Sequence, residues 1–221
     1  MSVFSGPNAV PTGLVLCLDV ANQLSYPGSG TAWNDVSGYR NIGTLTNTPT
    51  YTAGDNGYFT FSSNNYVTAP ASSLYAFGTG DFALECWYYA TSYSGYNHLM
   101  SLPDQGTMAL KANTGDGAIY LYSPSWTTYG STPGWTLALN TWNHVVFTRA
   151  SSVGYAYLNS TPCGSAIGFT NNFSAQILNI HNGWGVEFVP CRISSTRMYN
   201  RALSATEVTQ NFNALRGRYG V

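Results

Sequence analysis

Nine acidic residues are the first candidates for chemistry in this sequence of 221 residues, because a pair of carboxylates can hydrolyse a glycosidic bond. The two groups then stand about 5 to 9.5 Å apart, which residues i and i+2 on one face of a strand provide. No two acids lie two positions apart, and Asp81 and Glu85, which share a strand face, would be about 13 Å apart. Glu187 and Glu207 stand alone. The spacing therefore predicts a non-enzymatic protein, and a carboxylate pair formed across two strands stays open as the alternative.

Three histidines, His98, His144 and His181, are the next candidates, as general bases or metal ligands. None lies near a Gly-x-Ser-x-Gly elbow or a paired cysteine, so the sequence does not indicate a nucleophilic triad. Their wide spacing does not match a zinc site either. We expect His144 to be a core histidine bonded to backbone, and we expect no catalytic residue.

Two aspartates, Asp19 and Asp35, are the candidates for calcium ligands. Each lies beside a turn-rich stretch, and carboxylate oxygens on flexible loops suit Ca²⁺. The alternative is turn chemistry, in which an Asp side chain accepts hydrogen bonds from nearby backbone N–H groups. The sequence favours the turn interpretation, so we expect no cofactor and leave calcium open at these two positions.

Aromatic side chains on two exposed, glycine-containing polar loops could stack on sugar rings, because each sugar ring presents an apolar face. The surrounding serines and threonines would supply hydrogen bonds. The alternative is that these aromatics belong to the core or to a subunit interface, where Tyr and Trp are also enriched. The candidates are Trp126, Tyr129 and Trp135 in the stretch YSPSWTTYGSTPGW, and Trp184 in HNGWG.

The composition narrows the choice of partners. Only 8% of the residues are charged and the net charge is −1, which argues against nucleic acid, since that partner needs a clustered basic surface. Aromatic residues make up 15%, and Lys111 is the only lysine. Such a surface suits neutral, hydrogen-bonding partners such as sugars, or close packing against other protein subunits.

The N-terminus and the cysteines indicate the compartment. The opening MSVFSGPNAVPTGL has neither the basic nor the apolar region of a signal peptide, and no apolar run is long enough to span a membrane. We therefore expect a protein that is neither exported nor membrane-bound. Without export, widely spaced cysteines are expected to be buried thiols rather than disulfides. They are Cys17, Cys86, Cys163 and Cys191.

The elements that must position these residues are short strands at intervals of roughly ten residues, the pattern of a β-sandwich or jelly roll. Residues 82–90 alternate most clearly, with Phe82, Leu84, Cys86 and Tyr88 on one face. Trp87 on the opposite face, and Trp142, are expected to pack structurally. We expect one domain over residues 1–221. The predicted strands are 13–20, 58–61, 66–69, 82–90, 97–102, 108–111, 118–122, 142–149, 154–158, 177–180 and 193–199.

One helix is predicted, over residues 204–216. Ser204 and Glu207 form a capping box, and Leu203 before it can pack on Val208 as a hydrophobic staple. The apolar positions 208, 212 and 215 form one stripe, and Gly217 is expected to end the helix. A helix this short is marginal alone, so it must dock on the β-structure.

Four segments together resemble a known family. They are GLVLCLDVANQLSYPGSGTAWNDVSGYRNIGTLTNTPTY, DFALECWYYATS, TWNHVVFTRASSVGYAYLNSTP and RMYNRALSATEVTQNFNALRGRYG. In this order they resemble laminin-G-like modules of the concanavalin A-like lectin/glucanase superfamily. The resemblance implies a two-sheet antiparallel jelly roll with one short C-terminal helix. The Glu-x-Asp-x-x-Glu motif of the glucanases is absent.

The opening and closing segments resemble the form that such modules take in structural proteins of tailed phages. The resemblance implies a non-enzymatic virion protein, and we expect a capsid decoration protein, oligomeric, with capsid or tail proteins as partners and a face that binds cell-surface glycans. The alternatives are a tail-fibre or adhesin component, a free carbohydrate-binding lectin, and a glycan hydrolase.

Overall fold

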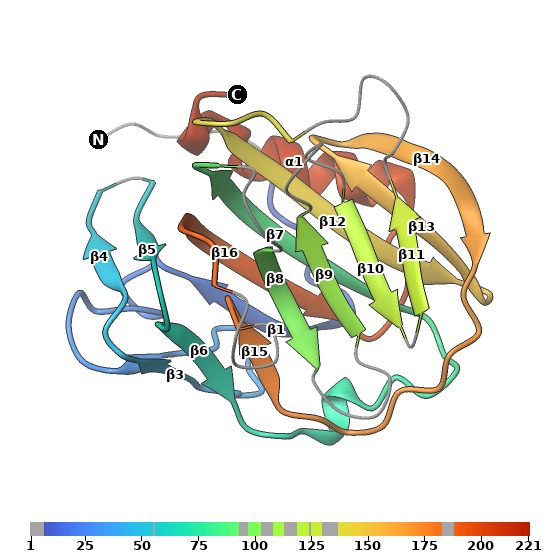
Figure 1. Cartoon of the computed structure of the whole chain (residues 1–221), viewed down its shortest axis with the longest axis horizontal. Helices are drawn as coiled ribbons and strands as arrows, with labels where there is room; N and C mark the ends of the chain where they lie inside the picture. Colours follow the sequence, from blue (N-terminus) through green and yellow to red (C-terminus); the bar gives the residue numbers. More distant parts are fainter. Residues whose placement is uncertain are drawn as a thin grey trace.

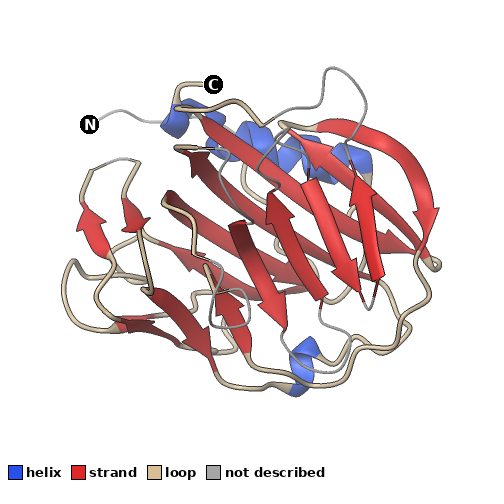
Figure 2. Cartoon of the chain, in the orientation of Figure 1, coloured by secondary structure: helices blue, strands red, loops and turns tan. Residues whose placement is uncertain are grey.

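The chain folds into two antiparallel sheets packed face to face, with one helix on the outside of the first sheet (Figure 1). The structure is a computed structural model that describes residues 7–54, 56–92, 97–102, 108–112, 119–123, 125–129, 137–182 and 188–221. Within residues 108–129 it describes the course of the backbone only. The predicted fold, an all-β two-sheet sandwich with one C-terminal helix, is confirmed, and Figure 2 shows how strongly strands dominate.

The first sheet, sheet A, is built around three long strands whose residues are buried on both faces. Its first strand, β1, pairs with β16, so the beginning and end of the chain meet in one ladder. In order across the sheet the strands are β14 (Thr161–Gly168), β13 (Val153–Leu158), β12 (Trp142–Ala150), β7 (Phe82–Ala90), β16 (Cys191–Tyr199), β5 (Tyr58–Phe61) and β4 (Thr50–Thr52), with β1 (Leu14–Asp19) beside β16.

The second sheet, sheet B, carries the β8–β11 strands at the front of Figure 1. A short 3-10 helix, η1 (Ser73–Tyr75), follows β6. The order is β11 (Ser125–Tyr129), β10 (Ile119–Ser123), β9 (Met108–Ala112), β8 (Asn97–Leu102), β15 (Leu178–Ile180), β6 (Tyr66–Ala69), β3 (Gly43–Thr46) and β2 (Ala32–Trp33).

The main core lies between the sheets and follows the predicted alternation. Phe82, Leu84, Cys86 and Tyr88 of β7 all belong to it, as predicted. The four cysteines are free and buried, which confirms the prediction of thiols. No helix in the described part of the chain is long and apolar enough to cross a membrane.

Helix α1 (Ala205–Tyr219) explains why the other face of sheet A is buried too. The ring of Trp87 stacks on Phe212 and on Tyr219, with centroids 5.8 and 4.2 Å apart. Tyr219 also lies against Trp142, at 4.8 Å. The predicted packing roles of both tryptophans are therefore confirmed, and the helix docks through its predicted apolar stripe.

The start of α1 is as predicted, and its end is not. Ser204 caps the helix, and both hydrogen bonds of the capping box with Glu207 are present. The helix continues through Gly217 to Tyr219, and Gly220 is the C-cap, with a left-handed φ of 69°. The extra turn buries the ring of Tyr219 against sheet A, which outweighs the low helix propensity of Gly217.

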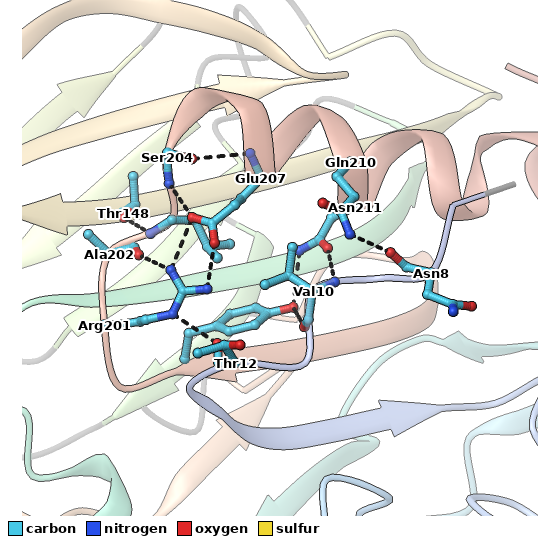
Figure 3. Close-up of polar contacts among 12 residues, drawn as sticks. Asn8, Val10, Thr12, Thr148, Arg201, Ala202, Ser204, Glu207, Gln210 and Asn211 are labelled. Carbon is cyan, nitrogen blue, oxygen red and sulfur yellow. Dashed lines mark hydrogen bonds and ion pairs between the residues drawn. The ribbon is translucent and has the colours of Figure 1, made fainter.

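The N-terminal segment fastens the helix from outside (Figure 3). The backbone N–H of Val10 donates to the Asn211 side-chain oxygen at 2.8 Å, and the Gln210 amide donates to the Asn8 carbonyl at 2.7 Å. The Arg201 guanidinium holds Glu207 with two hydrogen bonds of 2.6 and 3.0 Å. The helix is thus held by its neighbours on two sides.

Candidate functional site

The outer face of sheet B brings together residues from several strands. Residues directly opposite one another on adjacent strands lie on the same face. Trp126 pairs with Tyr122, Tyr122 with Ala109, Ala109 with Ser101, and Ser101 with Asn179. On β8 and β15, the positions on either side of this row belong to the core, namely Met100 and Leu102 beside Ser101, and Leu178 and Ile180 beside Asn179. Trp126 and its row therefore lie on the face turned away from sheet A.

A second row runs beside the first on this same face. Thr128 pairs with Tyr120, Tyr120 with Lys111, and Lys111 with His98. On β9, β10 and β11 the residues of the two rows are two positions apart in the chain. On β8, His98 and Ser101 are three positions apart, because the register shifts by one residue between His98 and Met100. The register thus places a tryptophan, two tyrosines and the only lysine of the sequence on one face of three adjacent strands.

The other predicted stacking residues do not join this face. Tyr129 is three positions from Trp126, and alternation assigns it to the opposite face of β11. The prediction of a loop for both residues was wrong, because residues 125–129 form an edge strand hydrogen-bonded to β10. Trp135 and Trp184 lie outside the described residues, so their roles stay predictions.

The β8–β15 part of the face is closed. His98, Ser101 and Asn179 are buried, and the Ser101 hydroxyl donates to the Asn182 carbonyl at 3.1 Å. Nearby, the two ring nitrogens of His181 lie 2.8 and 2.7 Å from the Asn65 and Val189 carbonyls. Burial lowers the pKa of His181. These residues are therefore enclosed by the protein and are not open to a ligand.

Glu85 is the most enclosed of the described carboxylates, at 1% exposure. One of its oxygens lies 2.5 Å from the Arg197 guanidinium and 3.2 Å from His144 Nε2, and the other accepts from Asn211 of α1 at 2.6 Å. Burial raises the pKa of Glu85, but the charges of Arg197 and His144 outweigh it and hold the pKa at about 2. The group is an anion locked between sheet A and the helix.

This network corrects the prediction for His144. His144 is completely buried, as predicted. Its ring contacts the Glu85 carboxylate and the rings of Trp87 and Phe212, and not the backbone hydrogen-bond partner that was predicted. The only local signal for this cluster was the presence of two charged residues, Glu85 and Arg197, inside predicted strands. Their pairing could not be predicted, because Glu85 lies more than a hundred positions from Arg197 and Asn211 in the chain.

Two further carboxylates also have structural partners. Glu207 closes the capping box, and its hydrogen bonds with Arg201 lower its pKa to about 2. Asp81 accepts a hydrogen bond from the Ser151 backbone N–H at 2.8 Å, in the turn between β12 and β13. Neither group is arranged as half of a hydrolytic pair among the residues that the structure describes.

The calcium candidates are surrounded by donors. Asp19 accepts from the Arg218 guanidinium at 2.8 and 2.9 Å. Asp35 accepts from the backbone N–H groups of Cys17, Ser37 and Asn41 at 2.8, 2.8 and 3.0 Å, as turn chemistry requires. A cation and N–H donors do not fit around a calcium ion, which needs oxygen ligands. Within the described ranges, no three His, Cys, Asp or Glu side chains group to hold a metal ion. These contacts are of the kind that the turn interpretation of Asp19 and Asp35 predicts.

A comparison of the sequence with models of known families shows which family the chain belongs to. The laminin-G-like model of the concanavalin A-like lectin/glucanases superfamily matches residues 61–209, more than half of the chain. The chain belongs to this superfamily. Members of the superfamily share the sandwich described above, and the match includes β7, β12, β16 and the first residues of α1. No curated protein sequence matches the chain.

Solved structures with the same fold include a sialidase and a neurotoxin binding domain. Trypanosoma rangeli sialidase in complex with sialic acid is 19% identical, with a TM-score of 0.66 over 96% of this chain and 34% of that one. The binding domain of botulinum neurotoxin DC in complex with SialylT is 12% identical, with a TM-score of 0.71 over 93% of this chain and 52% of that one. The superfamily member described here thus spans about a third to a half of those chains, and these identities show the fold alone.

Proposed function

We propose that this protein is a non-enzymatic carbohydrate-binding module, and that it binds glycans on the outer face of sheet B around Trp126. The observation that carries the proposal is the strand register, which assigns Trp126, Tyr122, Tyr120 and Lys111 to one face of three adjacent strands. Aromatic rings offer stacking surfaces for the apolar faces of sugar rings. The low share of charged residues, 8%, suits the same ligand.

The absence of catalysis is part of the proposal. The five described carboxylates, of nine in the sequence, each have a structural partner. A general acid needs a raised pKa and contact with its substrate, whereas Glu85 has a lowered pKa and is buried. The complexes of sialidase and neurotoxin domains with sialic acid and SialylT support a carbohydrate ligand for this fold.

The glycan proposal is tested with a glycan array and a matched pair of variants. Trp126→Ala should weaken binding of any glycan hit by about tenfold, because it removes one stacking surface. Tyr39→Ala is the control, since Tyr39 is 55% exposed and lies between β2 and β3, at the other edge of sheet B. An array without hits, or equal affinities of the Trp126 variant and the unaltered protein, would contradict the proposal.

We place this module in a virion, as a capsid decoration protein, with a tail-fibre component as the alternative. The support is the resemblance of its opening and closing segments to tailed-phage structural proteins. Mass spectrometry of purified virions tests the location. A copy number near that of the major capsid protein indicates decoration, a few dozen copies indicate the tail, and absence from the particle contradicts both. Size measurement of the isolated protein tests the expected homo-oligomer.

A further inference from the structure

A single arginine on the outer face of sheet A is held between two tyrosine rings. The guanidinium carbon of Arg192, on β16, lies 4.5 Å from the ring centre of Tyr89 and 5.1 Å from that of Tyr58. All three side chains are partly exposed. Cation–π contacts of this kind fix the direction of the guanidinium without using its N–H donors. The two rings therefore hold the Arg192 guanidinium in place, and its N–H groups remain free to donate hydrogen bonds to a ligand.

This arrangement differs from that of most other arginines. Five of the other six donate hydrogen bonds to carboxylates or backbone carbonyls, whereas the guanidinium of Arg192 has no hydrogen-bond acceptor among the residues that the structure describes. The exposed Arg40 has none there either, but it does not lie over an aromatic ring among the described residues. The phenol groups of Tyr58 and Tyr89 have no hydrogen-bond partner there either. The five donating arginines are Arg149, Arg197, Arg201, Arg216 and Arg218.

The residues around Arg192 form a row beside helix α1, and this row with Tyr58 is called the shelf below. Across the strands, Thr50 pairs with Thr60, Thr60 with Arg192, Arg192 with Tyr89, and Tyr89 with Trp142. Helix α1 contacts this row at Trp142, through the ring of Tyr219. Tyr58 and Tyr89 pack beside this contact and stay partly exposed. Thr50 is exposed and Thr60 partly exposed. Together with Tyr58, the row from Thr50 to Tyr89 thus offers hydroxyl groups, one cation and two aromatic rings.

We infer that this shelf is a second binding site, specific for a carboxylated sugar, with the sugar carboxylate held by Arg192. An arginine fork matches a carboxylate with two parallel hydrogen bonds. The tyrosine rings can contact the apolar face of the sugar, and the threonine and tyrosine hydroxyls can bond its hydroxyl groups. The site is separate from the face around Trp126, so it stands whether or not that face binds a glycan.

A sugar fits this shelf better than an acidic peptide does. A strongly acidic segment would be attracted by several cations, and here one guanidinium stands among uncharged hydroxyl and aromatic groups. One carboxylate on an otherwise neutral, hydroxyl-rich ring matches that pattern of one charge and several hydrogen-bonding groups. The ligand class is therefore a uronic or sialic acid unit within a glycan.

The test compares two probes that differ only in the carboxylate, methyl β-glucuronide and methyl β-glucoside, by NMR titration of the isotopically labelled protein. We expect the glucuronide to bind at least about tenfold more tightly and to shift the amide signals of residues 58–60, 89 and 192. Arg192→Gln should weaken glucuronide binding by about ten- to a hundredfold. Arg192→Lys should also weaken it, because lysine lacks the fork.

Two control variants distinguish the shelf from the rest of the protein surface. Arg216→Gln also removes a cation that lies over an aromatic ring, Phe212, and should leave glucuronide binding unchanged. Trp126→Ala should leave it unchanged too, which separates this proposal from the one for sheet B. Equal binding of the two probes, unchanged binding by Arg192→Gln, or shifts confined to other residues would overturn the inference. Acetate binding as tightly as the glucuronide would overturn the assignment to a sugar.

Discussion

Replacing Glu85 tests the idea that a buried ion cluster holds α1 on sheet A. The pKa of Glu85 falls from its ordinary value of 4.5 to about 2 in the folded protein. At about 1.4 kcal/mol for each tenfold change in the acid equilibrium, this fall corresponds to about 3 kcal/mol of folding stability. Glu85→Gln removes the charge and leaves Arg197 buried without its anion, a change that typically costs about 3 to 5 kcal/mol. We therefore expect a loss of about 3 kcal/mol at pH 7.

The pH dependence provides a second measurement. Because the folded-state pKa of Glu85 is lowered, its stabilising effect is complete above about pH 4.5 and disappears as the pH falls through about 2. Urea unfolding, followed by tryptophan fluorescence at pH 7 and at pH 3, should show the difference between the protein and the variant shrinking. The control is Glu207→Gln, whose partly exposed ion pair with Arg201 should cost about 1 kcal/mol. A Glu85→Gln cost below about 1 kcal/mol, or one equal at both pH values, would refute the reasoning.

The helix cap and the buried thiols can be tested in the same protein. Ser204→Ala removes the hydroxyl that accepts a hydrogen bond from the Glu207 backbone N–H and should lower the stability by about 1 kcal/mol, measured as a lower Tm. Thr209→Ala, on the exposed side of α1, should cost less. Equal Tm values for the Ser204 variant and the unaltered protein would contradict the role of the cap. Burial raises the pKa of all four thiols, that of Cys163 to about 12. Iodoacetamide at pH 8 should therefore label none of them in the native protein and all four in urea, as measured by mass spectrometry. Rapid labelling of the native protein would contradict this prediction.

The local patterns predicted much of the fold. The alternation of residues 82–90 predicted which side of β7 faces the core, and the capping box predicted the start of α1, because both signals depend only on near neighbours in the chain. The strand β14 was not predicted, since its sequence TPCGSAIG lacks a clear alternation and is stabilised by pairing with β13. The end of α1 also depended on a distant contact, the stack of Tyr219 on Trp87.

The candidate sites were predictable to a smaller degree. Trp126 could be chosen from its type and setting, but the face on which it lies required the register of β9, β10 and β11. Arg192 had no sequence signal at all. Its neighbours Tyr58 and Tyr89 are more than a hundred residues away in the chain, and only the pairing of β16 with β5 and β7 brings the three together.

The buried charges of sheet A position α1 and enclose the Glu85 carboxylate. A carboxylate that transfers protons must meet its substrate, and α1 closes the face of β7 on which Glu85 lies. Burying an ion pair adds little net stability compared with apolar packing, but it penalises any docking of the helix that separates the pair. The cluster of Glu85, Arg197 and Asn211 therefore specifies one position for α1. In that position the ring of Tyr219 meets the row at Trp142, and Tyr89 and Arg192 farther along the row stay partly exposed.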